Sequence, residues 1–428
     1  MNIVYLHSHD TGRYIQPYGY NVPTPNLMKL AEEGVIFRHA YSAAPTCSPS
    51  RSALLTGMTP HSCGMLGLTH RGFELNDPKQ HLASFLQDNG YRTVLCGIQH
   101  ETVDVGSLGY TDILSTESND KRNAALAAEY IKELPAKQPF FLSFGMINTH
   151  RDFPEPAPDL NPDFVMPPAL FYDHPINRDD MVRYMTSARI MDDCIGVVMN
   201  ALEQAGLMDN TLILYTTDHG LAFPHMKSQL YDGGIGVSLI MKHPTAFPRR
   251  GAVDALVSHL DVFPTLCELL ELDKPDWLQG ESLLPVLTGA EEEVREELFA
   301  EVTYHAAYEP MRCIRTQRYK YIRFYDEHGQ YVAANVDDGL AKTFMVEHGL
   351  LAEKHVNEML FDLYLDPVER VNLVGNPAYM EVYGSLRDRL ASWMESTDDP
   401  LLKGPVPKPP GARINTLSSL SPREQNYE

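Results

Sequence analysis

Residues 47 to 57 read Cys-Ser-Pro-Ser-Arg-Ser-Ala-Leu-Leu-Thr-Gly, which places Cys47 just before a predicted short helix and Arg51 four positions later. The free backbone N–H groups and partial positive charge of a helix start lower the pKa of a thiol there and bind an oxyanion. Cys47 is therefore a candidate nucleophile, or the precursor of one, and Arg51 is a candidate anion ligand. The alternative is a buried or disulfide-bonded cysteine beside a surface arginine.

Around this segment the hydrophobic pattern alternates between buried strands and amphipathic helices. Short apolar runs predict strands at residues 3–6, 93–96, 140–144, 211–215 and 237–241. Helical spacing of apolar residues predicts helices at residues 26–33, 81–88, 121–133 and 179–206. This alternation predicts an α/β fold with a mostly parallel sheet flanked by helices on both faces.

The pattern changes after residue 309. Three segments predict short antiparallel strands, at residues 311–316, 319–324 and 358–364, and residues 381–395 predict a terminal helix. Proline is frequent from residue 400 onward, which favours an extended tail. We therefore expect a catalytic domain over residues 1–308, followed over residues 309–428 by a smaller α+β C-terminal subdomain and tail.

Polar residues suited to acid–base or metal chemistry follow four of the predicted strands. In strand order they are His9 with Asp10, then His100, then His150, and then Asp218 with His219. Because ligands bind beyond the carboxyl ends of strands in open α/β sheets, we expect these side chains to meet at one edge. Such a cluster predicts a metal and acid–base site.

Asp10 and the pair Asp218-His219 are the best candidates for metal ligands. Carboxylates combined with an imidazole suit a hard or borderline divalent ion such as Ca²⁺, Mg²⁺ or Mn²⁺. Each has a structural alternative: Asp10 as a turn or cap residue, and the pair as a helix cap before Gly220. For His7 we expect a structural role.

The segment Cys47–Gly57 resembles the signature of the sulfatase family, in which Cys-x-Pro-x-Arg is continued by a helix ending in Thr-Gly. Further matching segments extend the resemblance over residues 2 to about 375: Gly97-Ile98-Gln99-His100, Asp218-His219-Gly220, Lys227, Ser258–Leu266 and Phe361-Asp362-Leu363. The sequence is most similar to the N-sulfoglucosamine (heparan) sulfohydrolase branch, notably through Cys47–Gly57, His61 and Gly64-Met65.

The resemblance implies an alkaline-phosphatase-like fold and a formylglycine residue, made from Cys47 by a formylglycine-generating maturation enzyme. It implies one divalent metal ion, Ca²⁺ or Mn²⁺ before Mg²⁺ or Zn²⁺, held by His9, Asp10, Cys47, Asp218 and His219. It implies that the catalytic residues are Cys47, Arg51, His100, His150 and Lys227.

In the mechanism of the family, a metal-bound formylglycine hydrate would attack sulfur while Arg51 and Lys227 hold the anion. His150 or Lys227 would protonate the leaving group, and His100 would remove the second hydroxyl proton. Three further histidines near these motifs are candidate substrate contacts at best: His61, His70 and His225.

The expected activity is that of a sulfuric ester hydrolase, cleaving a sulfate ester or sulfamate on a small sulfated sugar. The sequence departs from the family pattern where Ile98 stands in place of a lysine, and where His9 and His219 replace oxygen ligands. The two histidines favour Mn²⁺ or Zn²⁺ more than an all-oxygen site would. These departures leave open a phosphonate monoester or phosphodiester hydrolase on the same scaffold. A third hypothesis is a noncatalytic binding protein in which Cys47 stays a thiol.

Composition narrows the class of protein further. The chain has 428 residues, 43% of them hydrophobic, which is ample for a large core, and its formal net charge is -22. That charge argues against binding to nucleic acid or an anionic membrane, and a sulfated or phosphorylated substrate must be held by local positive charge. The sequence shows no signal peptide and no membrane span, and its six cysteines form no Cys-x-x-Cys pair. We therefore expect a cytoplasmic protein with reduced thiols, and the sequence leaves a homo-oligomer open.

Overall fold

The structure, a computed structural model, describes residues 1–134, 138–354 and 356–428. Its larger part is built on an eight-stranded sheet with the order β4-β3-β5-β1-β6-β7-β2-β8. The strands are β1 (Asn2–Ser8), β2 (Val35–Tyr41), β3 (Arg92–Gly97), β4 (Asp112–Ser115), β5 (Phe140–Gly145), β6 (Thr211–Thr217), β7 (Leu239–Lys242) and β8 (Gly251–Ser258). β7 pairs antiparallel with β6 and β2, whereas the other neighbours pair in parallel. The prediction of a mostly parallel sheet is confirmed.

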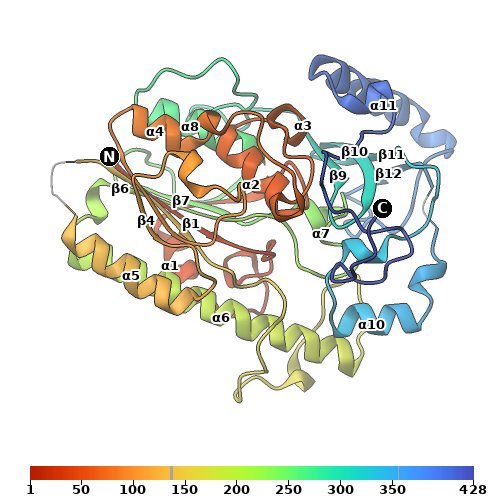
Figure 1. The fold of residues 1–428 in the computed structure, drawn as a ribbon, viewed down its shortest axis with the longest axis horizontal. Helices are drawn as coiled ribbons and strands as arrows, with labels where there is room; N and C mark the ends of the chain where they lie inside the picture. Colours follow the sequence, from red (N-terminus) through yellow and green to blue (C-terminus); the bar gives the residue numbers. More distant parts are fainter. Residues whose placement is uncertain (135–137, 355) are drawn as a thin grey trace.

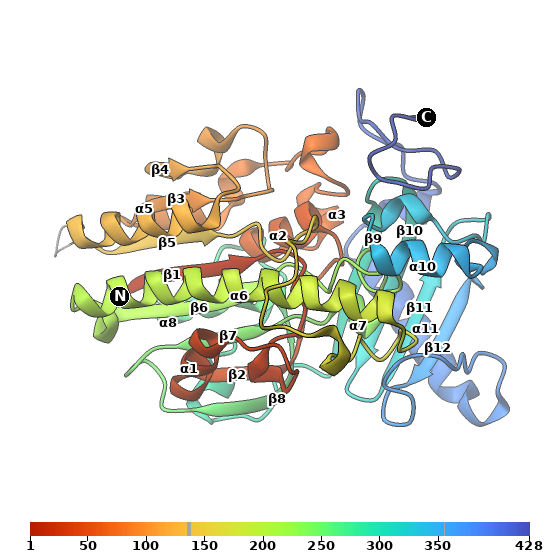
Figure 2. The same cartoon turned by 90° about the horizontal axis from the view of Figure 1, so that it is seen from below.

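Helices cover both faces of this sheet (Figures 1 and 2). One face is covered by α1 (Pro25–Glu33), α5 (Asp120–Glu133) and α6 (Pro175–Gln204). The other is covered by α2 (Cys47–Thr56), α4 (Leu82–Asp88), α8 (Val262–Leu269) and α9 (Leu284–Thr288), while α3 (Pro60–Cys63) and α7 (Asp232–Ile235) are single turns. In α6 the apolar residues repeat at helical spacing and are fully buried against the sheet, as Met191, Ile195, Val198 and Leu202 show. The four predicted helices are thus confirmed.

Three strands of the large sheet were not predicted from the sequence, and each has a local reason. The half-buried Arg38 and His39 interrupt the apolar run of β2. β4 is a four-residue edge strand that is partly exposed, so its side chains need not be apolar. β8 begins with exposed and half-buried residues and becomes continuously buried only from Ala255 onward. A search for continuous apolar runs therefore finds the strands at the centre of the sheet and passes over those nearer its edges.

A second sheet lies beyond the carboxyl ends of the central strands (Figure 2). Its order is β12-β11-β10-β9, and it is antiparallel throughout. The strands are β9 (Glu297–Tyr304), β10 (Tyr308–Thr316), β11 (Tyr319–Phe324) and β12 (Glu358–Asp362). The helix α11 (Met380–Ser396) packs on this sheet through Leu386, Leu390 and Met394, and α10 (Leu340–Glu347) lies against α6. The three predicted antiparallel strands are confirmed, and β9 adds a fourth from before the predicted domain boundary at residue 308.

The last part of the chain, which we call the C-terminal segment (residues 411–428), packs beside the second sheet (Figure 1) and bonds both to the loop between β9 and β10 and to Arg71 of the larger part. Ile414 and Asn415 are completely buried. The backbone N–H of Asn415 donates to the carbonyl of Ala306 at 2.8 Å. The predicted extended tail is therefore held by specific contacts. Within the described residues, no helix is both long enough and apolar enough to cross a membrane.

Glu309 is a buried acid on β10. Its carboxylate accepts hydrogen bonds from Asn335 Nδ2 at 2.8 Å and Gln229 Nε2 at 3.3 Å. Burial nevertheless raises its pKa to about 8, and these hydrogen bonds only partly oppose that shift. In the unfolded chain the pKa of glutamate is about 4.3. Between these two values the folded protein holds a proton that the unfolded chain lacks, so the free energy of unfolding falls as pH rises.

We expect Glu309→Gln to remove this pH dependence. From pH 5 to pH 8 the free energy of unfolding of the variant, relative to that of the wild type, should rise by at most about 1.4 kcal/mol per pH unit. The difference in melting temperature between the two proteins should rise with it. Thermal unfolding followed by circular dichroism across that range measures the difference. Glu395→Gln, on the exposed face of α11, is the control and should show a constant offset. A constant offset for Glu309→Gln as well would contradict the raised pKa.

Candidate active site

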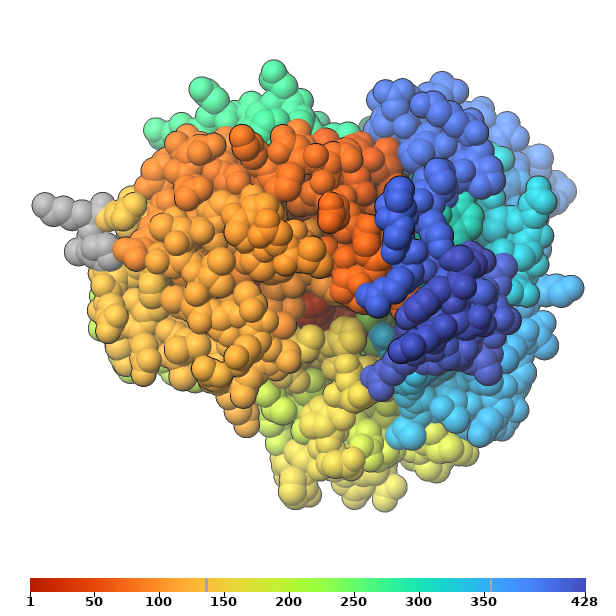
Figure 3. Space-filling model, in the orientation of Figure 1, coloured from red at the N-terminus to blue at the C-terminus, as the bar shows by residue number. Residues whose placement is uncertain are grey.

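The four strands predicted to deliver functional residues are consecutive in the sheet, in the order β3-β5-β1-β6. They run parallel, so their carboxyl ends open at one edge. Figure 3 shows a hollow on this side of the molecule. The red N-terminal part of the chain forms its floor, and orange, yellow and dark blue segments border it. The side chains that follow the four strands therefore converge in one site.

A cluster of potential metal ligands lies at the centre of this site. Ligand atoms of His9, Asp10, Cys47 and Asp218 all lie within 4.8 Å of one another. Asp10 adopts a left-handed backbone conformation, with φ of 51°, and its backbone N–H donates to Asp218 Oδ1 at 2.8 Å. His9 Nδ1 lies 3.0 Å from the other carboxylate oxygen of Asp218. The ends of β1 and β6 are thus joined directly through Asp218.

The donor atoms of this cluster fit a bound cation. His9 Nε2 and Asp10 Oδ1 are buried, and neither has a hydrogen-bond partner among residues 1–134, 138–354 and 356–428. Buried polar atoms are almost always paired, so two unpaired acceptors in one ligand cluster indicate a missing positive partner. Burial, and then the charge of Arg51, lowers the pKa of His9 to about 4, which leaves its ring neutral and able to act as a ligand.

His219 lies at the rim of this cluster. Its Nδ1–H donates to the carbonyl of Gly220 at 2.9 Å, which leaves the lone pair on Nε2. Nε2 lies 3.2 Å from Asp10 Oδ1 and 3.4 Å from the sulfur of Cys47. An acceptor nitrogen facing a carboxylate and a sulfur is again a ligand arrangement. The structure therefore places all five predicted metal ligands around one point, and their role as ligands remains a prediction.

Cys47 is the first residue of α2 and only 2% of it is exposed. Burial raises the pKa of its thiol well above the usual range, although the charge of Lys227 acts in the opposite direction. The sequence-based expectation of a lowered thiol pKa is therefore wrong, because loss of solvent outweighs the helix start. A thiol that stays protonated is a poor nucleophile. This environment favours Cys47 as the precursor of the reactive group over Cys47 as the reactive group itself.

Arg51 is buried one turn further along α2, with its guanidinium directed at the ends of β1 and β6. Nη2 donates to the carbonyl of Ser8 at 2.8 Å and lies 3.2 Å from Asp218 Oδ2, while Nη1 bonds to His7 Nδ1. Nε lacks a partner within the described part of the chain. Burial and the charge of Arg51 keep the pKa of His7 well below its usual value, so His7 accepts from Arg51. Arg51 thus holds Asp218 in place and keeps its Nε–H for an anion, and His7 has the structural role expected for it.

Lys227 reaches the site from the loop after β6. Its Nζ lies 2.9 Å from Asp10 Oδ2, 2.6 Å from Asp337 Oδ2 and 3.4 Å from His150 Nε2. Burial alone would lower the pKa of Lys227, but Asp10 and Asp337 hold it well above its usual value. Asp337 was missed by sequence reasoning: it follows no strand, and it lies beyond the predicted domain boundary. A lone carboxylate in a loop gives no sequence signal.

His100 lies beside the cluster, with its ring centroid 6.0 Å from that of His9. Its Nε2 is 2.9 Å from His70 Nδ1, an interaction that sequence reasoning also missed. Its Nδ1 is buried and has no hydrogen-bond partner in the part of the chain that the structure describes. Burial, followed by the neighbouring His9 and His70, lowers the pKa of His100 well below the usual value. The ring is therefore neutral, which leaves one of its two nitrogens as an acceptor.

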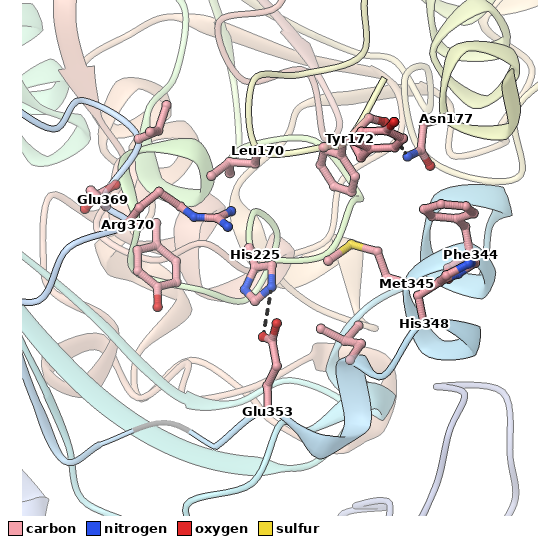
Figure 4. Close-up of a pocket in the computed structure, with 14 residues that line it drawn as sticks. Leu170, Tyr172, Asn177, His225, Phe344, Met345, His348, Glu353, Glu369 and Arg370 are labelled. Atoms are coloured by element: carbon pink, nitrogen blue, oxygen red, sulfur yellow. Dashed lines mark hydrogen bonds and ion pairs between the residues drawn. The ribbon is translucent and has the colours of Figure 1, made fainter. Parts of the chain in front are cut away.

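The two other candidate histidines lie elsewhere. His61 pairs with Glu301, at 2.9 Å between His61 Nδ1 and the carboxylate. His225 faces Glu353, at 3.4 Å, in a separate pocket of about 460 Å³ (Figure 4). That pocket is lined by α10 and the loop before α6, including Tyr172, Phe344 and Met345. Of the three suggested substrate contacts, the structure brings only His70 to the site.

Comparison with known protein families gives two matches. A family model described as "Sulfatase" matches residues 1–272. A second, described as "N-sulphoglucosamine sulphohydrolase, C-terminal", matches residues 219–338. The two matches overlap over residues 219–272, which include Lys227, and together they reach Asp337.

Among characterised proteins, a human N-sulphoglucosamine sulphohydrolase is 28% identical over 443 residues, covering 90% of this chain and 88% of the relative. An ulvan-active sulfatase of Formosa agariphila is 28% identical over 465 residues, covering 93% of this chain and 75% of the relative. Among solved structures, one described as a complex with its substrate D-glucosamine-2-N,6-O-disulfate has a TM-score of 0.72 at 20% identity, covering 94% of this chain and 99% of that one. A 2-O GAG sulfatase has a TM-score of 0.73 at 21% identity, covering 100% and 98%. These structures share the fold described above.

Proposed function

This chain belongs to the sulfatase family and is a sulfuric ester hydrolase, and we propose that it removes a sulfate group from the oxygen or nitrogen of a small sugar. The observation that supports this most is the position of Cys47 among His9, Asp10 and Asp218, with all four ligand atoms within 4.8 Å. The choice of a sugar rests on the relatives, whose names refer to sulfated glucosamine and to ulvan.

Membership of the family implies a divalent metal and a formylglycine at position 47, for which the host must supply a maturation enzyme. When both are present, they supply an oxygen nucleophile activated by a nearby positive charge. We propose that His9, Asp10, Asp218 and His219, together with residue 47, hold the metal. The carboxylate oxygens of Asp10 and Asp218 suit Ca²⁺ and the two imidazoles suit Mn²⁺, so these are the two ions we propose.

His150 is our candidate for the acid that protonates the leaving group. Its Nε2 is 3.4 Å from Lys227 Nζ, and its side chain is 28% exposed, so it lies on the open side of the site. Lys227 is a poor alternative, because two carboxylates hold its proton firmly. Lys227 instead supplies a fixed positive charge beside the place where the sulfate must lie. This local charge offsets the field of a protein whose net charge is -22.

His100 is our candidate for the base that restores the resting state. Its neutral ring has one nitrogen, Nδ1, that is unpaired in the described structure. We propose that Nδ1 takes the proton of the hydroxyl remaining on residue 47. With formylglycine at position 47, this proton transfer to His100 would let the aldehyde reform as sulfate leaves.

A parallel assay tests the proposed function. Protein whose residue 47 has been converted should be given an aryl sulfate, glucosamine N-sulfate and an aryl phosphodiester. We expect kcat/KM for a sulfated substrate to exceed that for the phosphodiester by at least about 100-fold. The reverse order would support a phosphodiesterase instead, which the absence of a cation at Ile98 makes the second candidate. Absence of turnover on all three by converted protein would contradict the proposed substrate class, and an intact mass that shows Cys47 unconverted in protein from the native host would favour the binding-protein hypothesis.

Replacing Asp218 by asparagine should weaken metal binding. Asp218 Oδ1 accepts from the backbone N–H groups of Asp10 and His219, and Oδ2 lies 3.0 Å from His9 Nδ1. The substitution removes one negative charge from this ligand set. We expect metal affinity to fall at least about tenfold, as measured by titrating metal-free protein with Ca²⁺ or Mn²⁺ in a calorimeter. Asp209→Asn, at an exposed position outside the site, is the matched control. Unchanged affinity in Asp218→Asn would show that Asp218 is a structural cap.

A further inference from the structure

His70 and His100 form a pair of imidazoles at the edge of the site. His70 Nδ1 lies 2.9 Å from His100 Nε2, and the two rings are nearly parallel, with an interplanar angle of 3°. Exactly one proton can lie between two such nitrogens when both rings are neutral. Either His100 donates through Nε2 and keeps a free lone pair on Nδ1, or His70 donates and His100 carries its proton on Nδ1. Only the first arrangement lets Nδ1 of His100 accept a proton.

The surroundings of His70 favour the first arrangement. His70 is an exposed residue, so a proton on its Nε2 can be solvated. In the second arrangement the buried Nδ1–H of His100 would have no acceptor within the described residues, and orphaned buried donors are rarer in proteins than orphaned acceptors. Partial burial, followed by the charges of Arg71 and Arg413, lowers the pKa of His70 to about 4. His70 is therefore neutral and can accept.

The C-terminal segment holds His70 in this position. Arg413 Nη2 donates to the backbone carbonyl of His70 at 2.8 Å. The neighbouring Arg71 is nearly buried, and it donates to Asn415 Oδ1 at 2.7 Å and to the carbonyl of Pro422 at 2.6 Å. Backbone and side-chain bonds thus tie the short turn that contains His70 to the last part of the chain.

We propose that His70 is a positioning residue that fixes the tautomer and orientation of His100, and that the C-terminal segment keeps His70 in place through Arg413 and Arg71. The same logic operates around metal-bound histidines, where the partner of one ring nitrogen determines the state of the other. This inference rests on the proposed function only in treating His100 as a base. The tautomer itself is a property of the unmodified protein.

The first test measures the tautomer without any turnover. Protein labelled with ¹⁵N-histidine, with Cys47 left as a thiol, is examined by long-range ¹H–¹⁵N correlation NMR, and His100→Gln identifies the His100 signals. We expect the unprotonated nitrogen of His100 to be Nδ1 in the wild type, and a mixture of tautomers in His70→Leu. A proton on Nδ1 of His100 in the wild type would overturn the proposal, even if the enzyme is an active sulfatase.

The second test separates positioning from folding in converted enzyme. His70→Leu should lower kcat by about 10- to 100-fold with a smaller change in KM. His70→Asn should recover most of the loss, because its Oδ1 accepts a hydrogen bond near the position of Nδ1. Arg413→Ala should lower kcat several-fold, whereas Lys403→Ala, an exposed position before the C-terminal segment, should not. Equal losses in His70→Leu and His70→Asn would contradict the proposal, and the NMR result stands if His70→Leu does not fold.

Discussion

Cys47→Ala is expected to lower kcat by a factor on the order of 10⁴ or more, leaving only a trace of sulfatase activity. The side chain at position 47 is the one group in the ligand cluster that the family converts into a nucleophile, and alanine cannot be converted. The fold should persist, because the change removes one sulfur atom from a position held by the backbone of α2. We expect a melting temperature within a few degrees of the wild-type value.

The wild-type reference must first be shown to be converted, by an intact mass about 18 Da below that of the unmodified chain. Cys194→Ala is the matched control, since Cys194 is an equally buried free cysteine that packs in the core between α6 and the sheet and does not belong to the ligand cluster. It should retain activity. Near wild-type turnover in Cys47→Ala would rule out position 47 as the source of the nucleophile.

Arg51→Ala should impair both stability and activity. Arg51 lies against Asp218 with both groups shielded from solvent, so its removal leaves a buried carboxylate without its cation. The cost of such an uncompensated charge is about 3–5 kcal/mol of unfolding free energy. The displaced Asp218 would also disturb the ligand cluster, and we expect kcat/KM to fall by a factor on the order of 10²–10³. Denaturant unfolding and steady-state kinetics measure the two effects.

A partly exposed arginine provides the contrast. Arg183 pairs with Glu155 and Asp179 at the surface, and Arg183→Ala should cost no more than about 1 kcal/mol and leave kcat/KM unchanged. Arg51→Lys keeps a positive charge but loses the planar fork that reaches Ser8 and His7 together, so it should restore stability only in part. A stable Arg51→Ala variant with low activity would instead indicate that Arg51 acts mainly on the substrate.

The sequence predicted the parts of the site that depend on strand ends. His9, Asp10, His100, His150 and Asp218 each follow a buried apolar run, and parallel strands bring their carboxyl ends together whatever the details of packing. The fold class followed from the same runs. The strands outside the centre of the sheet were harder to find, because half-buried residues weaken the hydrophobic pattern on which the prediction depends.

Two features of the site could not be predicted from local sequence. Asp337 and the His70–His100 contact join residues that are far apart in the chain, and neither residue type is unusual in a loop. The pKa of Cys47 was predicted in the wrong direction for a related reason. A helix start is visible in the sequence, whereas the degree of burial, which outweighs it, depends on the packing of the whole protein.

The ion pair between Lys227 and Asp337 makes the active site depend on residues from both parts of the chain. Every candidate catalytic or metal-binding residue named from the sequence lies before residue 309. A gene fragment ending there would encode all of them, yet its Lys227 would lack one of its two carboxylate partners, and the turn at His70 would lack its support. Exchanging the C-terminal parts of two relatives would therefore alter the charge balance at the centre of the enzyme as well as its periphery. The two parts of this chain are best exchanged or redesigned together.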